Sequence, residues 1–260
     1  MATFWVGALG ACLMVPYRGE GAPILDGDIG TDWDVSGVYV FADEAGDVTG
    51  VSDSGYDILA THFYYDSTPD VLYVAIDTDG IAGDADGDGN PGNWGGANPA
   101  PNDVDPADYG FGGGQGITVY ESFGVAFDMN RDETYDYVAG VRPNGDYTDD
   151  AGLYVWGGGA DFWYDDDWDS YSGAATTSWS PSPGDSAPDI EFKITGFSLL
   201  NNNSKVIDFN FRVHNGSFGD NIGEDFAVGS VPEPRVLGLL ATLSLMGAFR
   251  RRRRVATEGT

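Results

Sequence analysis

Apolar residues along much of this chain recur at every second position, the spacing of β-strands that bury one face. The clearest case spans residues 206–213, where apolar side chains alternate with Asp208, Asn210 and Arg212. Runs of β-branched and aromatic residues bounded by Gly, Pro, Asp and Asn predict further strands at residues 38–41, 57–65, 71–76, 117–120, 122–127, 135–141, 152–156 and 189–194.

These strands predict an all-β fold, because helical periodicity is almost absent from the same stretch. About nine or ten strands separated by turn-rich loops favour an antiparallel β-sandwich or jelly roll. The expected domain covers residues 23–230, which is long enough to bury a core of its own.

A different pattern occupies the C-terminal end of the chain. Pro232, Glu233 and Pro234 precede an uncharged apolar run at residues 236–249, and this run is followed by five arginines, Arg250, Arg251, Arg252, Arg253 and Arg254. As a helix the run would cover about 21 Å of a hydrocarbon core about 30 Å thick, so it would span with help from snorkelling arginines. The arginines predict a cytoplasmic end and an exported body.

This order of tripeptide, membrane segment and arginine cluster resembles the PEP-CTERM sorting signal of Gram-negative bacteria. The resemblance covers residues 231–254 and leaves 255–260 as a short tail without an assigned role. It implies recognition of Pro232, Glu233 and Pro234 by the membrane enzyme exosortase, a stop-transfer role for the arginines, and release to the outer surface or the extracellular matrix. An ordinary C-terminal membrane anchor is the alternative.

The N-terminal end predicts export as well. Residues 4–15 have the length and hydrophobicity of a signal-peptide core, so we expect a signal helix within residues 1–22, the general secretion machinery as a partner, and cleavage after Ala22. The residues Leu9 to Cys12 also resemble a lipobox, in which Cys12 would be acylated. Cys12 is the only cysteine, so a protein cut after Ala22 would have no disulfide.

Charge narrows the partners of the exported body. The chain holds 42 acidic and 12 basic residues, a formal net charge of −30, and only five of the basic residues lie between positions 23 and 230. This charge excludes nucleic acid and anionic lipid as favoured partners. It also predicts bound calcium, which is abundant outside cells and prefers oxygen ligands.

Two aspartate-rich loops are the candidate calcium sites. The first places Asp84, Asp86, Asp88 and Asn90 at alternate positions with intervening glycines, and Asp77 and Asp79 could complete its shell. The second carries Asp128, Asn130, Asp132 and Asp136 between two predicted strands. Each resembles the start of an EF-hand loop but lacks the glutamate at position twelve, and the second has Glu133 where a glycine is usual. Exposed acidic turns are the alternative for both.

Three short stretches resemble family 9 carbohydrate-binding-like sandwiches: residues 23–35, residues 71–77 and residues 190–194. The resemblance implies the fold and carries over no sugar-binding residue. Residues 156–179 independently mix aromatic and acidic side chains, which suit stacking and hydrogen bonding to sugar rings. Trp163 and Trp168 are the candidate glycan-binding residues, and packing against the end of the sandwich is the alternative.

No motif predicts an enzyme. Neither His62 nor His214 lies in a nucleophile motif or suggests zinc, and with so many acids any carboxylate pair could be proposed for glycoside hydrolysis. The sequence therefore favours an exported, calcium-stabilised, non-enzymatic protein that passes through the inner membrane and associates with exopolysaccharide. A carbohydrate-active enzyme, hydrolase or lyase, on the same fold is the alternative.

Overall fold

Strands account for the regular structure of this protein, apart from two short 3-10 helices, η1 (Thr31–Trp33) and η3 (Phe197–Asn201), within the part described here. The computed structural model describes residues 13–14, 21–47, 55, 57–82, 121–141, 151–157, 168–181, 183–184, 186–217 and 225–232. Within these ranges no helix has the length and hydrophobicity needed to cross a membrane. The predicted membrane segment at residues 236–249 lies outside them.

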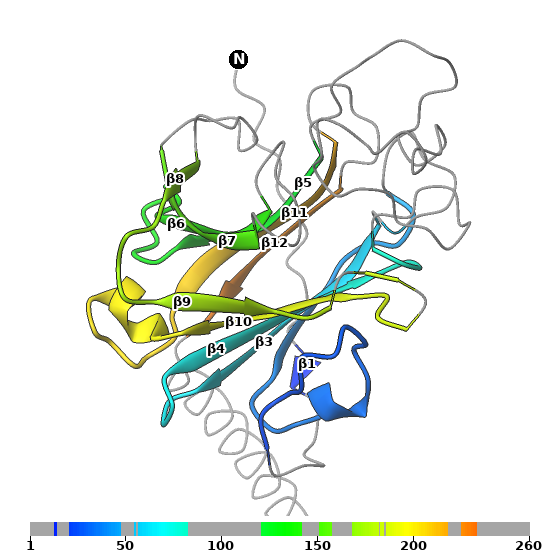
Figure 1. Cartoon of the computed structure of the whole chain (residues 1–260), viewed down its shortest axis with the longest axis horizontal. Helices are drawn as coiled ribbons and strands as arrows, with labels where there is room; N and C mark the ends of the chain where they lie inside the picture. Colours follow the sequence, from blue (N-terminus) through cyan, green and yellow to red (C-terminus); the bar gives the residue numbers. More distant parts are fainter. Residues whose placement is uncertain are drawn as a thin grey trace, which may run out of the picture.

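The first sheet contains six antiparallel strands in the order β1-β2-β3-β4-β10-β9 (Figure 1). Their bounds are β1 (Leu13–Met14), β2 (Tyr39–Ala42), β3 (Ile58–Asp66), β4 (Val71–Thr78), β10 (Ile190–Thr195) and β9 (Thr176–Trp179). Strands β2, β3 and β4 are neighbours both in the sheet and along the chain, and only four residues connect β3 to β4.

The second sheet also has six antiparallel strands, in the order β12-β11-β5-β6-β7-β8. Its strands are β12 (Asp225–Val231), β11 (Phe209–Ser217), β5 (Glu121–Asp128), β6 (Tyr137–Val141), β7 (Ala151–Trp156) and β8 (Trp168–Ser170). Strands β5 to β8 again follow one another in the sheet. The twelve strands within the described ranges exceed the nine or ten expected.

Aromatic side chains from the two sheets meet in a common core, which confirms the β-sandwich. Phe41 of β2 lies with its ring centroid 4.8 Å from that of Phe211 in β11, and Phe63 of β3 lies 4.6 Å from the same ring. A Cβ at Gly229 of β12 would come within 2.5 Å of Phe211 and 3.0 Å of Phe41, so only glycine admits this close packing.

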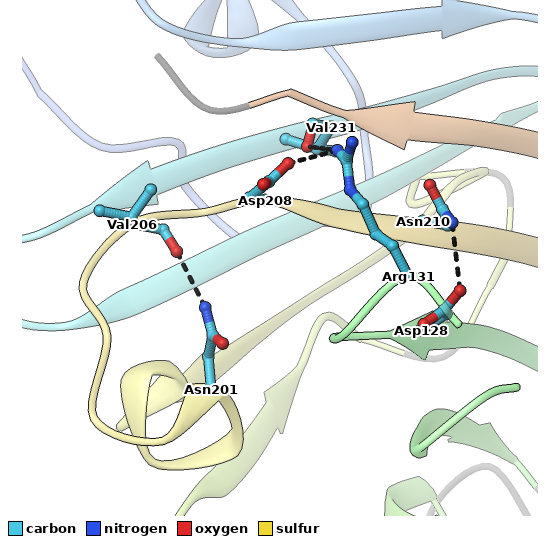
Figure 2. A network of polar contacts seen from close by, with 7 residues as sticks. All are labelled: Asp128, Arg131, Asn201, Val206, Asp208, Asn210 and Val231. Atoms are coloured by element: carbon cyan, nitrogen blue, oxygen red, sulfur yellow. Dashed lines mark hydrogen bonds and ion pairs between the residues drawn. The ribbon is translucent and has the colours of Figure 1, made fainter. Parts of the chain in front are cut away.

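The predicted alternation before and within β11 is confirmed. The apolar members Ile207, Phe209, Phe211 and Val213 are all buried. The strand begins at Phe209 and not at Val206, because the preceding residues belong to a turn in which Asn201 Nδ2 donates to the Val206 carbonyl at 2.9 Å (Figure 2).

Most other predicted strands match observed ones, with shifts of one or two residues at their ends. The strand expected at residues 117–120 lies outside the described ranges. The signal-helix prediction is wrong for Leu13 and Met14, which pair instead with Val40 and Tyr39 of β2. The free edge of β2 offers backbone hydrogen-bonding groups that a two-residue strand can satisfy.

The outer face of the first sheet is covered by the segment before β2, drawn in blue in Figure 1. Trp33, Val35 and Val38 of this segment are buried with Ala75 of β4. A second, smaller apolar cluster lies on the outer face of the second sheet and contains Ala126, Val138, Tyr154 and Trp156. Both sheets therefore bury apolar residues on two faces.

Candidate functional site

The second predicted calcium loop closes the hairpin between β5 and β6. Asp128 ends β5, Tyr137 begins β6, and Phe127 pairs with Tyr137 across the hairpin. Asp128 is only 1% exposed, whereas Asn130 and Asp132 lie at the surface. We call residues 128–136 the β5–β6 loop.

The buried Asp128 carboxylate is fully engaged by hydrogen bonds. Its Oδ1 accepts the backbone N–H of Asp132 at 3.2 Å, and its Oδ2 accepts the N–H of Glu133 at 3.1 Å. The same Oδ2 accepts Nδ2 of Asn210, on the neighbouring strand β11, at 3.1 Å (Figure 2). Asp128 thus organises the loop and links it to the sheet.

The other three predicted ligands also fold back onto the loop. The N–H of Asp132 donates to Asn130 Oδ1 at 2.9 Å, the N–H of Thr134 donates to Asp132 Oδ1 at 3.0 Å, and the N–H of Met129 donates to Asp136 Oδ2 at 2.8 Å. Burial, followed by repulsion from Asp128 and Asp132, raises the pKa of Asp136 despite the stabilising N–H bond.

Two residues of the β5–β6 loop adopt left-handed backbone conformations, Arg131 with φ 59° and Glu133 with φ 70°. Glycine adopts this region at little cost, and residues with a Cβ are strained there. Glu133 occupies the position that is usually glycine in an EF-hand loop. The β5–β6 loop therefore has the left-handed conformation at this position, although glutamate is strained there and glycine is not.

Arg131 has a structural role that the sequence pattern did not reveal. Its guanidinium forms an ion pair with Asp208 and donates from Nη2 to the Val231 carbonyl at 2.9 Å (Figure 2). These contacts join the β5–β6 loop to the approach of β11 and to the last residue of β12. The partners lie 77 and 100 residues away in the chain, so no local motif could indicate them.

The oxygen-only donor set of the β5–β6 loop suits a hard cation such as calcium. Among the described residues, no three His, Cys, Asp or Glu side chains are gathered to hold a metal ion. The calcium prediction for this loop therefore stays a prediction. The first predicted loop, with Asp84, Asp86, Asp88 and Asn90, lies outside the described residues.

The aromatic candidates divide between packing positions and positions that are not described. Trp156 is 8% exposed and belongs to the outer cluster of the second sheet, and Trp179 stacks on the core residue Phe192 with centroids 4.4 Å apart. Trp168 begins β8, where its backbone pairs with Trp156. Trp163 lies outside the described residues, so the glycan-binding prediction is not tested.

Glu191 is a second important residue that the sequence pattern did not single out. This fully buried carboxylate in β10 accepts the N–H of Asp26 at 2.9 Å, and it also accepts the N–H of Gly27 and Nε1 of Trp33. It anchors the segment before β2 to the sheet. Two of the stretches that resemble family 9 carbohydrate-binding-like domains therefore meet at one carboxylate with a structural role.

Both histidines are strand residues. His62 lies in β3 with its ring centroid 5.8 Å from that of Trp33, and its two buried ring nitrogens have no hydrogen-bond partner in the part of the chain that the structure describes. Burial lowers the pKa of His62 to about 4. His214, in β11, is fully buried, and burial lowers its pKa as well.

The end of β12 falls at the start of the predicted sorting segment. Val231 is fully buried as the last residue of β12, and Pro232 follows directly. Glu233, Pro234 and the arginines at residues 250–254 lie outside the described residues, as does most of the predicted signal peptide.

Comparison of the chain with protein-family models, curated proteins and solved structures finds no match in any of the three.

Proposed function

We propose that this protein is exported through its N-terminal signal and retained by a C-terminal PEP-CTERM segment until processing releases a non-enzymatic β-sandwich to the cell surface or extracellular matrix. The observation that carries this proposal is the position of β12, whose last residue, Val231, directly precedes Pro232. Removal of the chain from the Pro232–Pro234 region onward would therefore leave every described strand in place.

The charge distribution supports the same route. Cleavage near Pro232 to Pro234 would remove Arg235 and the five-arginine cluster, which together hold half of the 12 basic residues. The released body would be strongly acidic and would repel anionic membranes. An acidic domain of this kind can bind the calcium that is abundant outside cells, which is consistent with a place in a polysaccharide matrix.

The sorting proposal is tested by expressing the full chain in Gram-negative cells with and without an exosortase. We expect a C-terminal truncation, detected by intact-mass spectrometry, only when the enzyme is present. Replacing Pro232, Glu233 and Pro234 together by Ala should abolish the truncation, and the control Pro181→Ala, at an exposed proline of the body, should leave it intact. Truncation of the triple variant at the same residue would contradict the proposal.

Calcium stabilisation is the second part of the proposal, and the oxygen-rich β5–β6 loop supports it. Calcium bound only by the folded state raises the thermal midpoint through binding linkage. We expect millimolar calcium to raise the midpoint of the full-length protein above its value in chelator. An unchanged midpoint would contradict calcium stabilisation and would not affect the sorting proposal.

Association with exopolysaccharide is the third part, and the aromatic and acidic residues around Trp163 and Trp168 support it. Changing both tryptophans to Ala should weaken binding to purified host polysaccharide, while Trp179→Phe, at a half-buried position stacked on Phe192, should not. Analysis of the polysaccharide after incubation separates a binder from the alternative hydrolase or lyase, since only an enzyme would shorten it.

A further inference from the structure

Three strand ends of the first sheet lie beside one another at one corner, and each is flanked by an aspartate. Asp43 directly follows β2, Asp57 directly precedes β3, and Asp79 directly follows β4. Backbone hydrogen bonds fix this arrangement: the N–H of Asp43 donates to the Leu59 carbonyl at 2.9 Å, and the N–H of Asp79 donates to the Asp57 carbonyl at 2.9 Å. With Asp47 in the turn after β2, these residues form what we call the acidic corner.

Two carboxylate oxygens of the acidic corner are buried without a hydrogen-bond donor. Asp57 is only 2% exposed, and its Oδ2 accepts the Gly46 N–H at 2.7 Å, but its Oδ1 has no hydrogen-bond partner among the described residues. Oδ2 of Asp43 is likewise buried and unpartnered. Buried carboxylate oxygens are costly unless a hydrogen bond, a proton or a cation replaces the lost water, so both oxygens are candidate ligands for a cation.

The charges around these oxygens are all of one sign. Asp43 is repelled by Asp47, Asp57 and Glu44, and Asp57 is repelled by Asp47 and Asp79. No basic side chain is among the groups that shift the pKa of either residue. Burial, the largest cause, raises the pKa of Asp43 to about 6 and raises that of Asp57 as well.

We propose that the acidic corner binds one calcium ion, with Asp57 Oδ1 and Asp43 Oδ2 as its two buried carboxylate ligands. Calcium takes six to eight oxygen ligands, which include backbone carbonyls and water. Two carboxylates therefore suffice, and no third acidic side chain among the described residues is gathered with them. Neither of the two ligands belongs to the aspartate loops identified in the sequence, and the site requires neither the sorting signal nor glycan binding.

The test counts calcium ions bound by the purified full-length protein. After removal of metal by chelator, equilibrium dialysis against calcium should show that Asp57→Asn binds one ion fewer per chain than the parent. Asp43→Asn should weaken the same site at least tenfold. The matched control is Asp66→Asn at the opposite end of β3, where the carboxylate accepts the Thr68 N–H at 2.9 Å, and it should bind as the parent does.

Thermal midpoints distinguish loss of a site from loss of the fold. In chelator, Asp57→Asn should melt at or above the temperature of the parent, because it removes a buried, unpaired charge and its amide oxygen can still accept the Gly46 N–H. In calcium, the order should reverse, because only the parent gains from this site.

Two results would overturn the proposal: unchanged calcium stoichiometry in both Asp57→Asn and Asp43→Asn, or a lower midpoint of Asp57→Asn in chelator. Changing Asp84, Asp86 and Asp88 together to Asn probes the first aspartate loop separately. Loss of an ion in that variant does not affect the count at the acidic corner, so failure of either site is recognisable.

Discussion

The β5–β6 loop and the acidic corner have similar composition but differ in how their carboxylates are partnered. In the loop, Asp128 is as buried as Asp57 of the corner, yet both of its oxygens accept hydrogen bonds. In the corner, Asp57 and Asp43 each keep a buried oxygen without a donor among the described residues. The buried carboxylate of the loop is therefore satisfied by protein N–H groups, whereas two carboxylate oxygens of the corner are not.

This difference separates two uses of aspartate. A carboxylate that accepts several N–H groups stabilises a turn without any cation. A carboxylate that is buried among like charges destabilises the fold until a cation or proton neutralises it. Removal of charge should therefore have opposite effects at the two sites when metal is absent.

The largest effect is expected at Asp128. Asp128→Ala leaves the N–H groups of Asp132 and Glu133 and the Asn210 amide without their acceptor, so the free energy of unfolding should fall by about 3 kcal/mol. Urea denaturation in chelator measures this change without interference from calcium. The exposed Asp132→Ala should cost less than about 1 kcal/mol, and equal losses in the two variants would show that Asp128 does not organise the loop.

A third buried carboxylate, that of Asp189, makes the stability of the fold depend on pH. It is 7% exposed and accepts the Ile29 N–H at 2.8 Å, but burial, with repulsion from Asp77 and Asp28, raises its pKa from 3.8 to about 6. Because the folded pKa is the higher one, the stability that Asp189 contributes is present below pH 4 and is lost as pH rises through 6.

Asp189→Asn should remove this loss, which is on the order of 2 kcal/mol between pH 4 and pH 7. Urea midpoints measured across this range would show a flatter profile for the variant than for the parent. Asp169→Asn, at an exposed position in β8, should keep the parental slope. Identical slopes for parent and Asp189→Asn would contradict the expectation.

A smaller effect is expected at Arg131, which attaches the β5–β6 loop to β12. Arg131→Gln should lower the free energy of unfolding by about 1 kcal/mol, mainly through the lost hydrogen bond to the Val231 carbonyl. The ion pair with Asp208 adds little because both side chains are more than a third exposed, Arg131 at 35% and Asp208 at 41%. Lys205→Gln is the matched control, because Lys205 donates to the Ser67 carbonyl at 2.9 Å from an exposed position.

The smallest effect is a gain in stability at Glu133. Glu133→Gly relieves a left-handed backbone conformation while keeping the N–H that Asp128 accepts, so the free energy of unfolding should rise by up to about 1 kcal/mol. Glu44→Gly, at a residue without positive φ, should instead lower it. A loss of stability in both variants would mean that the Glu133 side chain stabilises the loop.

Local patterns in the sequence predicted most strands correctly, and the exceptions have identifiable causes. The two-residue and three-residue strands β1 and β8 are too short to show alternation. Strand β9 lies at an edge and has no fully buried residue. Strand β12 includes Gly229, whose missing side chain makes room for Phe211 but interrupts the apolar pattern.

The sequence alone determined the β-sandwich class and both aspartate loops as candidates, because alternation and turn residues act over a few positions. Only the tertiary structure decided which carboxylates find donors. Glu191 meets Gly27 across 164 residues, and Arg131 reaches Val231 across 100. The unpartnered oxygens of Asp43 and Asp57 arise where separate strand ends converge, and their burial follows from packing that no local pattern encodes.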